Sequence, residues 1–240
     1  MKQNKFRISS TIGKNLLWLW LKKDLSDVKS ELGVDLAGGS MSNKPFFKTK
    51  RYISVDINEI KLKEGLQVYS DAIAVNDTIQ NYLSNTKEKP NLLVCVQTFG
   101  TNLLFEHQET EKVIRSMSET LSVGGSMAFN IGIQSDIDTE LLKNRLYSFL
   151  NSRFQNVKYN FYSELDFRTN IRPRWKIIND EVVSVPNKKK YKYKIIEKIK
   201  NKLKTKIMFC IAYLIYFLPL LRIKSGLKKK NLYCFCSNKL

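Results

Sequence analysis

The sequence has few residues of the kinds that bind transition metals, with one histidine and four cysteines among 240 residues. Zinc sites take most of their ligands from His and Cys, and these cysteines show neither zinc-site nor disulfide-framework spacing. We therefore expect no metal site and a reduced, cytoplasmic setting. Two of the cysteines are two positions apart in a strand-like run, so their side chains should share one buried face. The four are Cys95, Cys210, Cys234 and Cys236.

The chain also lacks an apolar run of the length that a spanning helix needs. Ile207–Leu221 has fifteen uncharged residues, which extend about 22 Å as a helix, whereas the hydrocarbon core of a bilayer is about 30 Å thick. Leu16–Leu21 is shorter, and no small-residue cleavage site follows it, so it does not predict a signal peptide. We expect no membrane span.

Acidic residues are nearly absent from the last quarter of the chain. The formal net charge is +19, and residues 186–240 contain 16 of the 41 Lys and Arg residues but one of the 22 acids, Glu197. Lys188–Lys206 reads as an amphipathic basic helix, and the uncharged run Ile207–Leu221 follows it. A domain of nearly balanced charge that carries a strongly basic C-terminal region predicts an anionic surface as partner. We expect residues 188–230 to lie on a membrane without crossing it. The alternative is a hydrophobic helix buried against the domain or an oligomer partner.

The G-x-G-x-x-G spacing of dinucleotide-binding sites is absent as well. In its place, a short buried strand ends on Asp35 and breaks into a turn containing Gly38 and Gly39, and a second strand, Tyr52–Asp56, ends on another acid. A strand, a glycine turn, a crossover and a strand ending in Asp form the nucleotide-binding half of a doubly wound α/β sheet. An acid at the second strand's tip can accept hydrogen bonds from ribose hydroxyls.

Asp35 directly before the glycines resembles motif I of the class I S-adenosylmethionine-dependent methyltransferases, an acid followed by G-x-G-x-G. Only Gly39 keeps its glycine in register, because Ala37 and Met41 occupy the other two positions. The resemblance implies S-adenosylmethionine as cofactor. Met41 is expected to crowd the loop and weaken cofactor binding.

The resemblance continues through the later strands. Gln67–Ala72 reads as a third strand ending on Asp71, which the resemblance implies as an acceptor for the adenine amino group. Asn91–Gln97 reads as a buried central strand, followed by a helix over Glu109–Leu121, a Gly124-Gly125 turn and a fifth strand. The cofactor-binding residues implied are Asp35, Ala37, Gly38, Gly39, Asp56, Ile57, Asp71, Ala72 and Gln97.

A subgroup resemblance comes from Lys44-Pro45-Phe46-Phe47 and Tyr52-Ile53-Ser54-Val55-Asp56. Both stretches are similar to methyltransferase-domain proteins of bacterial surface-polysaccharide and glycan biosynthesis. Pro45 disfavours a helix there, so this loop is expected to lie over the cofactor.

We therefore expect a mostly parallel seven-stranded doubly wound sheet, preceded by a helix over 11–32. Phe154–Tyr162 should be the sixth strand and Asn231–Cys236 the last, antiparallel one. The methyltransferase-like domain would comprise 1–186 with 231–240, and 187–230 would be a helical insertion that associates with a membrane.

Three functions fit these patterns. The first is O-methylation of a cell-envelope glycan or lipid-linked sugar at the inner face of the membrane. The second is a non-catalytic methyltransferase-like protein, since Ala37 and Met41 depart from the motif. The third is a nucleic-acid methyltransferase, against which the uncharged run beside the lysines argues. No general base can be named, and Asp71, Glu106 and His107 are candidates by location alone.

Overall fold

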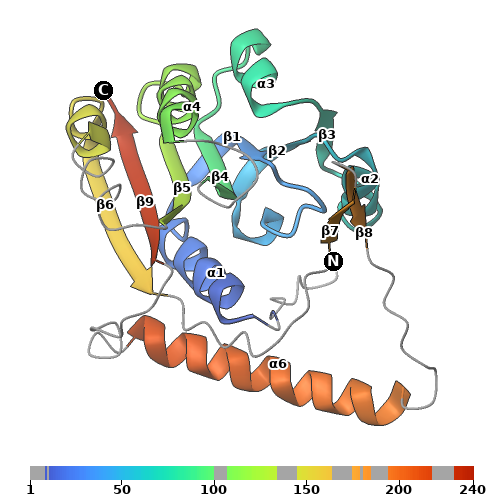
Figure 1. Ribbon diagram of the computed structural model, residues 1–240. Coiled ribbons are helices and arrows are strands. Elements are labelled where there is room, and N and C mark those ends of the chain that lie inside the picture. The colour runs from blue at the N-terminus through green and yellow to red at the C-terminus, as the bar shows by residue number, and fades with distance from the viewer. Residues whose placement is uncertain are drawn as a thin grey trace.

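The computed structural model describes residues 9, 11–99, 107–133, 145–163, 175–178, 181–184, 194–217 and 230–240. Within these ranges the chain forms a seven-stranded sheet in the order β3-β2-β1-β4-β5-β9-β6 (Figure 1). The first five strands in this order pair in parallel, and β9 runs antiparallel to both of its neighbours. The predicted mostly parallel sheet with a last antiparallel strand is confirmed.

The strands of this sheet are β1 Lys29–Leu36, β2 Lys48–Asp56, β3 Ile73–Asn76, β4 Leu92–Phe99, β5 Ser126–Ile133, β6 Phe154–Ser163 and β9 Lys230–Lys239. The helices are α1 Ile12–Asp24, the 3-10 turn η1 Lys44–Phe46, α2 Glu59–Val68, α3 Ile79–Asn85, α4 His107–Thr120 and α6 Lys194–Phe217; residues 145–151 are also helical. A separate hairpin joins β7 Trp175–Ile178 to β8 Glu181–Ser184, and nothing in the sequence patterns had predicted it.

Helices cover the sheet on both faces, because alternate residues of each buried strand point to opposite sides. Apolar residues of α3, α4 and 145–151 pack on one face with Val34, Ile53 and Phe129. On the other face α1 packs against β4, β5 and β9, and Trp20 lies edge-on to Tyr233. In Figure 1, α6 lies outside α1 and forms an additional outer layer.

The predicted end of the N-terminal helix needs correction. The helix expected over 11–32 ends at Asp24, because β1 begins at Lys29, where it pairs with the start of β2 at Lys48. Every residue of Leu16–Leu21, including Trp18, is buried in one cluster with residues of the sheet, η1 and α6.

The crossover between β1 and β2 contains no α-helix. Eleven residues, 37–47, connect the strands, and the 3-10 turn η1 with Pro45 at its start is their helical element. Proline fixes φ near −65° and lacks an N–H donor, which suits the first turn of a short helix. The expected irregular loop around Pro45 is therefore present.

The predicted basic helix and the apolar run after it are joined in one structure. Residues 194–217 form the single helix α6, which passes from its lysine-rich half into its apolar half without a break. Residues 187–193 and 218–229 of the predicted insertion lie outside the described residues.

Candidate cofactor site at the carboxyl edge of the sheet

The loop after β1 retains the backbone of a three-glycine turn although it contains two glycines. Ala37, Gly39 and Met41 have φ values of 56°, 50° and 58°. These are the three positions at which the motif has glycine, and they adopt the left-handed conformation that glycine adopts at low cost. Alanine in place of glycine would cost little at position 37 if φ were negative, but φ is positive there. Ala37 and Met41 therefore hold a left-handed conformation that costs roughly 1–2 kcal/mol per residue.

Gly38 is required by close packing. A Cβ atom at this position would lie 2.3 Å from Ser54 Oγ and 2.9 Å from Asp35 Oδ2. The N–H of Gly38 donates to the Val55 carbonyl at 3.2 Å, so the turn is held against β2. Any side chain here would push the loop away from the strand tip.

Asp56 at the tip of β2 joins the loop to the sheet. Its Oδ2 accepts a hydrogen bond from the Gly39 N–H at 2.8 Å, and its Oδ1 accepts one from the Asn58 N–H at 2.8 Å. Each carboxylate oxygen has a second lone pair, so Asp56 can still accept two hydroxyl donors. Ile57, the next residue, is 66% exposed and places an apolar side chain beside this carboxylate. The predicted pair Gly39 and Asp56 is thus brought together.

Asp35 is not available for direct contact with a ligand, contrary to expectation. Its side chain is fully buried and accepts hydrogen bonds from Tyr52 Oη at 2.8 Å and from Asn43 Nδ2 at 3.3 Å to each oxygen. Burial raises the pKa of Asp35 to about 7; the hydrogen bonds from Tyr52 and Asn43 oppose that rise, and the charge of Asp56 adds to it. Asp35 therefore ties both ends of the β1–β2 crossover together.

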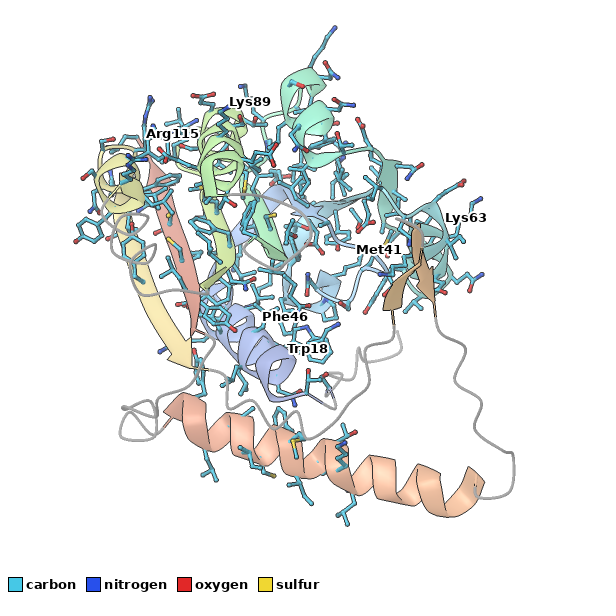
Figure 2. All side chains as sticks on the ribbon, in the orientation of Figure 1. Trp18, Met41, Phe46, Lys63, Lys89 and Arg115 are labelled. Atoms are coloured by element: carbon cyan, nitrogen blue, oxygen red, sulfur yellow. The ribbon has the colours of Figure 1, made fainter. Side chains whose placement is uncertain are left out.

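Met41 also differs from the expectation that it crowds the cofactor. Its side chain is fully buried in a small cluster with Tyr52, Leu62 and Tyr69, between the loop and α2 (Figure 2). A Cβ atom on Gly65 of α2 would lie 2.7 Å from Met41 Cγ. The side chain is therefore directed under α2 and anchors the loop.

Asp71 and Ala72 lie at the wrong end of their strand for the predicted role. The stretch expected as strand three is the end of α2 and a turn, and β3 begins at Ile73. Asp71 is highly exposed and forms an ion pair with Lys44 at 2.7 Å. That bond lowers the pKa of Asp71. Asp71 precedes β3, and the carboxyl end of that strand lies three residues, about 10 Å, beyond Ile73.

The residues at the carboxyl end of β3 are Asn76 and Asp77, which the sequence patterns had not singled out. Asn76 pairs with Asp56 across the strands, and its Nδ2 donates to the Asp56 carbonyl at 3.0 Å. The sequence contains a signal for these boundaries. Asn58 is a helix-capping residue whose side chain accepts from the Lys61 N–H at the start of α2, and the apolar run of the next strand begins at Ile73. The run from Ile73 to Asn76 followed by an acid is the better match to a strand tip.

Gln97 lies at a bulge near the end of β4. Its φ is 61°, its side chain is exposed, and its N–H donates to Asn130 Oδ1 of β5 at 2.7 Å. The register between β4 and β5 shifts between Cys95 and Phe99. Bulges re-aim side chains next to functional sites, so Gln97 remains a candidate here and Asn130 positions it.

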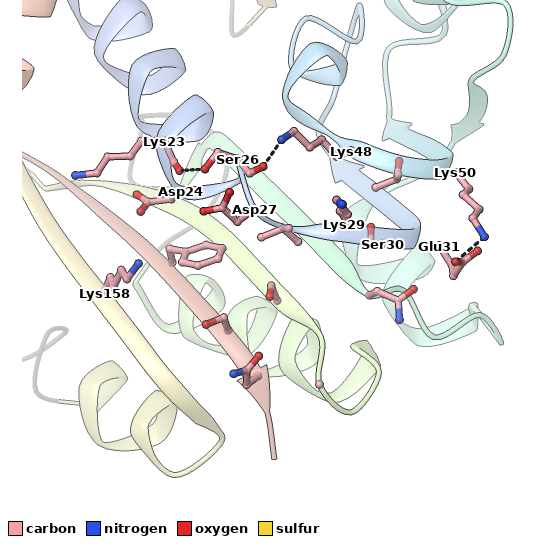
Figure 3. Close-up of a pocket in the computed structure, with 18 of the residues that line it drawn as sticks. Lys23, Asp24, Ser26, Asp27, Lys29, Ser30, Glu31, Lys48, Lys50 and Lys158 are labelled. Carbon is pink, nitrogen blue, oxygen red and sulfur yellow. Dashed lines mark hydrogen bonds and ion pairs between the residues drawn. The ribbon is translucent and has the colours of Figure 1, made fainter.

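A large cavity among the described residues lies at the opposite edge of the sheet. It measures about 1190 Å³ and is lined by the amino ends of β1, β2 and β5 with residues that include Lys29, Lys48 and Ser126 (Figure 3). Lys50 pairs with Glu31 at 2.8 Å on its rim. Ligands of open α/β sheets bind outside the carboxyl ends of the strands, so this groove is not the candidate site.

Two general-base candidates have no described surroundings. Glu106 lies outside the described residues, and His107 is the first residue of α4. In the part of the chain that the structure describes, no group of three or more His, Cys, Asp or Glu side chains could hold a metal ion. Among the same residues no helix has both the length and the apolar character needed to traverse a membrane.

Solved structures with a similar arrangement identify the fold. The N-methyltransferase NodS from Bradyrhizobium japonicum WM9 in complex with S-adenosyl-L-homocysteine is 11% identical, with 98% of this chain and 89% of that chain covered and a TM-score of 0.52. The fold is that of the class I methyltransferases. A Streptococcus thermophilus rRNA methylase is 18% identical over 62% of this chain and 87% of that chain, with a TM-score of 0.45. The plantazolicin methyltransferase BamL is 10% identical over 96% and 85%, with a TM-score of 0.48. No protein-family model and no curated protein matches the chain.

Proposed function

We propose that this chain is an S-adenosylmethionine-dependent methyltransferase. The observation that carries the proposal is the Asp56 carboxylate at the β2 tip, tied to the Gly39 N–H and flanked by exposed Ile57. The two remaining lone-pair positions suit a pair of ribose hydroxyls, and Ile57 offers an apolar surface for an adenine ring. The left-handed loop of Ala37, Gly39 and Met41 supports the same assignment, because it keeps the backbone close to that carboxylate.

The chemistry asked of the chain is mainly positioning. The cofactor supplies a methyl group already activated by its sulfonium. Asp56 and the loop would fix the nucleoside end, and Asp35, Asn43 and Tyr52 would hold the loop in place from within. Asn130 would fix the backbone of Gln97 at the neighbouring strand end. The non-catalytic alternative is weakened by the retained loop backbone, since Ala37 and Met41 have not altered its conformation.

For the acceptor we propose a cell-envelope glycan or lipid-linked sugar that is methylated on oxygen. Support comes from the similarity of Lys44–Phe47 and Tyr52–Asp56 to methyltransferase-domain proteins of bacterial glycan biosynthesis. Lys44, whose side chain lies over the rings of Tyr52 and Tyr69, belongs to the same β1–β2 connection as Gly38 and Gly39. Nucleic acid is the competing acceptor because the chain is basic overall.

Calorimetric titration with S-adenosylhomocysteine tests cofactor binding. Asp56→Ala should weaken binding at least about 100-fold, since hydrogen bonds to charged groups contribute about 1.5–3 kcal/mol each. Asp71→Ala is the matched control: it removes a carboxylate at the far end of β3 and should leave affinity unchanged. Equal losses in both variants, or no loss in Asp56→Ala, would refute the assigned site.

Transfer of a labelled methyl group tests the acceptor. Lipid-linked sugars and purified RNA are offered separately to the protein with labelled S-adenosylmethionine. Label in the sugar fraction that depends on Asp56 supports the proposal. Label in RNA alone would replace the glycan assignment, and intact cofactor binding without transfer to either would favour the non-catalytic alternative.

A further inference from the structure

The outward face of α6 carries an exposed apolar stripe. Leu203, Ile207 and Leu214 are 59%, 45% and 50% exposed, and Cys210 is exposed between them. Their spacing of three and four residues places them on one side of the helix. Tyr213, 47% exposed, widens the stripe. A row of large apolar side chains facing water along a helix marks an interaction surface.

The opposite face of α6 is fixed to the domain. Ala212 and Tyr216 are buried in the cluster that contains the apolar residues of α1, and Met208, Phe209 and Ile211 are packed against it. Lys23 of α1 lies over the Tyr216 ring at 5.8 Å. Phe209 is therefore used for packing against the domain, whereas the outward stripe is exposed.

Charge is separated along the helix axis. The first thirteen residues of α6 contain six lysines and one glutamate, and the last eleven contain no charged residue. Lys204 and Lys206 are exposed beside Leu203 and Ile207. In Figure 1 the lysine-rich half extends past α1. The surface thus combines cationic side chains with an adjoining apolar stripe.

We infer that this outward face of α6 docks on an anionic membrane surface. The helix lies parallel to the bilayer, with lysines among anionic headgroups and Ile207, Tyr213 and Leu214 at the acyl boundary. Both features are needed at such an interface, since each lysine near the surface adds electrostatic attraction and the apolar stripe adds burial that salt does not screen. The docking is independent of the proposed methyl transfer.

The charge pattern selects a membrane over other occupants. A second copy of α6 would oppose lysines to lysines in a parallel pairing and lysines to the uncharged half in an antiparallel one, and neither arrangement supplies an anionic partner. Nucleic acid would satisfy the lysines but would leave the stripe without an apolar partner. An anionic bilayer satisfies both.

The native cysteines provide a direct probe. Cys210 is exposed, whereas Cys95, Cys234 and Cys236 are buried, so an environment-sensitive fluorophore attaches at Cys210 in the full chain. The protein should float with vesicles containing 30% phosphatidylglycerol and not with pure phosphatidylcholine vesicles. The probe's emission should shift to the blue, and brominated lipid should quench it. Absence of flotation, or flotation without any emission shift, overturns the inference.

Paired substitutions separate the apolar and the electrostatic contributions. Ile207→Ser with Leu214→Ser should weaken partitioning about tenfold or more, given half-exposed side chains. The matched control, Ile60→Ser with Val123→Ser, removes two exposed apolar residues elsewhere and should have no effect. All variants should keep the melting temperature, because these side chains face outward.

Lys204→Glu with Lys206→Glu should weaken partitioning at least about 20-fold at low salt, and Lys87→Glu with Lys89→Glu should weaken it much less. Equal effects of the two lysine pairs would show attraction by net charge alone. Burial of the Cys210 probe that rises with protein concentration without vesicles would assign the face to a dimer. Displacement from vesicles by RNA would assign it to nucleic acid. Each of these results overturns the inference.

Discussion

Replacing Asp35 by Asn should remove a pH dependence of stability that originates inside the fold. The carboxyl group is fully buried, and burial raises its pKa from 3.8 to about 7. Below pH 3.8 the group is protonated in both states and contributes no pH dependence. Between that pH and about 7 the unfolded chain ionises while the folded protein does not, so stability falls as pH rises.

The size of the effect follows from the shift. A rise of about three pH units corresponds to about 4 kcal/mol at 1.36 kcal/mol per unit. Above pH 7 the carboxyl group is ionised in both states, so the loss in the free energy of unfolding is complete and no longer changes with pH. In Asp35→Asn the new amide can accept from Tyr52, and the Asn43 amide can turn to present its oxygen, so the fold should be retained.

The assay is denaturant unfolding of both proteins from pH 4 to pH 8. The wild-type free energy of unfolding minus that of Asp35→Asn should decrease by about 4 kcal/mol across this range and then level off. Asp71→Asn is the control, for which the difference should stay flat over this range: Lys44 lowers the pKa of Asp71, so its contribution is lost only as pH falls below the ordinary carboxyl range. A wild-type-minus-variant difference for Asp35 that is flat with pH would refute the buried carboxyl network.

Two further predictions concern the loop. Ala37→Gly should raise the free energy of unfolding by about 0.5–1 kcal/mol, because φ is 56° there and glycine relieves the strain; chemical denaturation measures it, and a loss of stability would show that the Ala37 contacts outweigh the strain. Met41→Ala should lower it by about 2–5 kcal/mol, since the side chain is fully buried under α2. The same variant tested by calorimetry with S-adenosylhomocysteine should bind no more tightly than wild type; tighter binding would restore the crowding hypothesis.

The sheet was largely predictable from sequence because its strands are short apolar runs with clear ends. Leu92–Phe99 and the Gly124-Gly125 turn into β5 are of this kind, and Cys234 and Cys236 share a buried face as expected. The prediction failed at Gln67–Ala72, where Val68 and Tyr69 favour strand, but Val68 is the last residue of α2 and Tyr69 packs against Leu62 of that helix. Tertiary packing there overrides local propensity.

The candidate site was less predictable, because its contacts join residues far apart in the chain. The loop glycines and Asp56 could be paired from their positions at strand ends. No local pattern indicates that Tyr52 Oη reaches back to Asp35, seventeen residues earlier, or that Met41 is directed under α2. The backbone conformation of Ala37 and Met41 is likewise invisible in sequence, since neither residue favours positive φ.

The pairing of Ser163 with Lys230 has a consequence for how this chain could be altered. These two residues face each other at the end of antiparallel strands, so all 66 residues between them, α6 included, leave and re-enter the sheet at one point. In topological terms they are the loop of a β-hairpin. Loop-closure entropy rises slowly with length, and closing 66 residues instead of four costs only about 2.5 kcal/mol more. A short turn in their place would therefore preserve the strand order, but it would also uncover the part of the α1 cluster in which Ala212 and Tyr216 of α6 are buried.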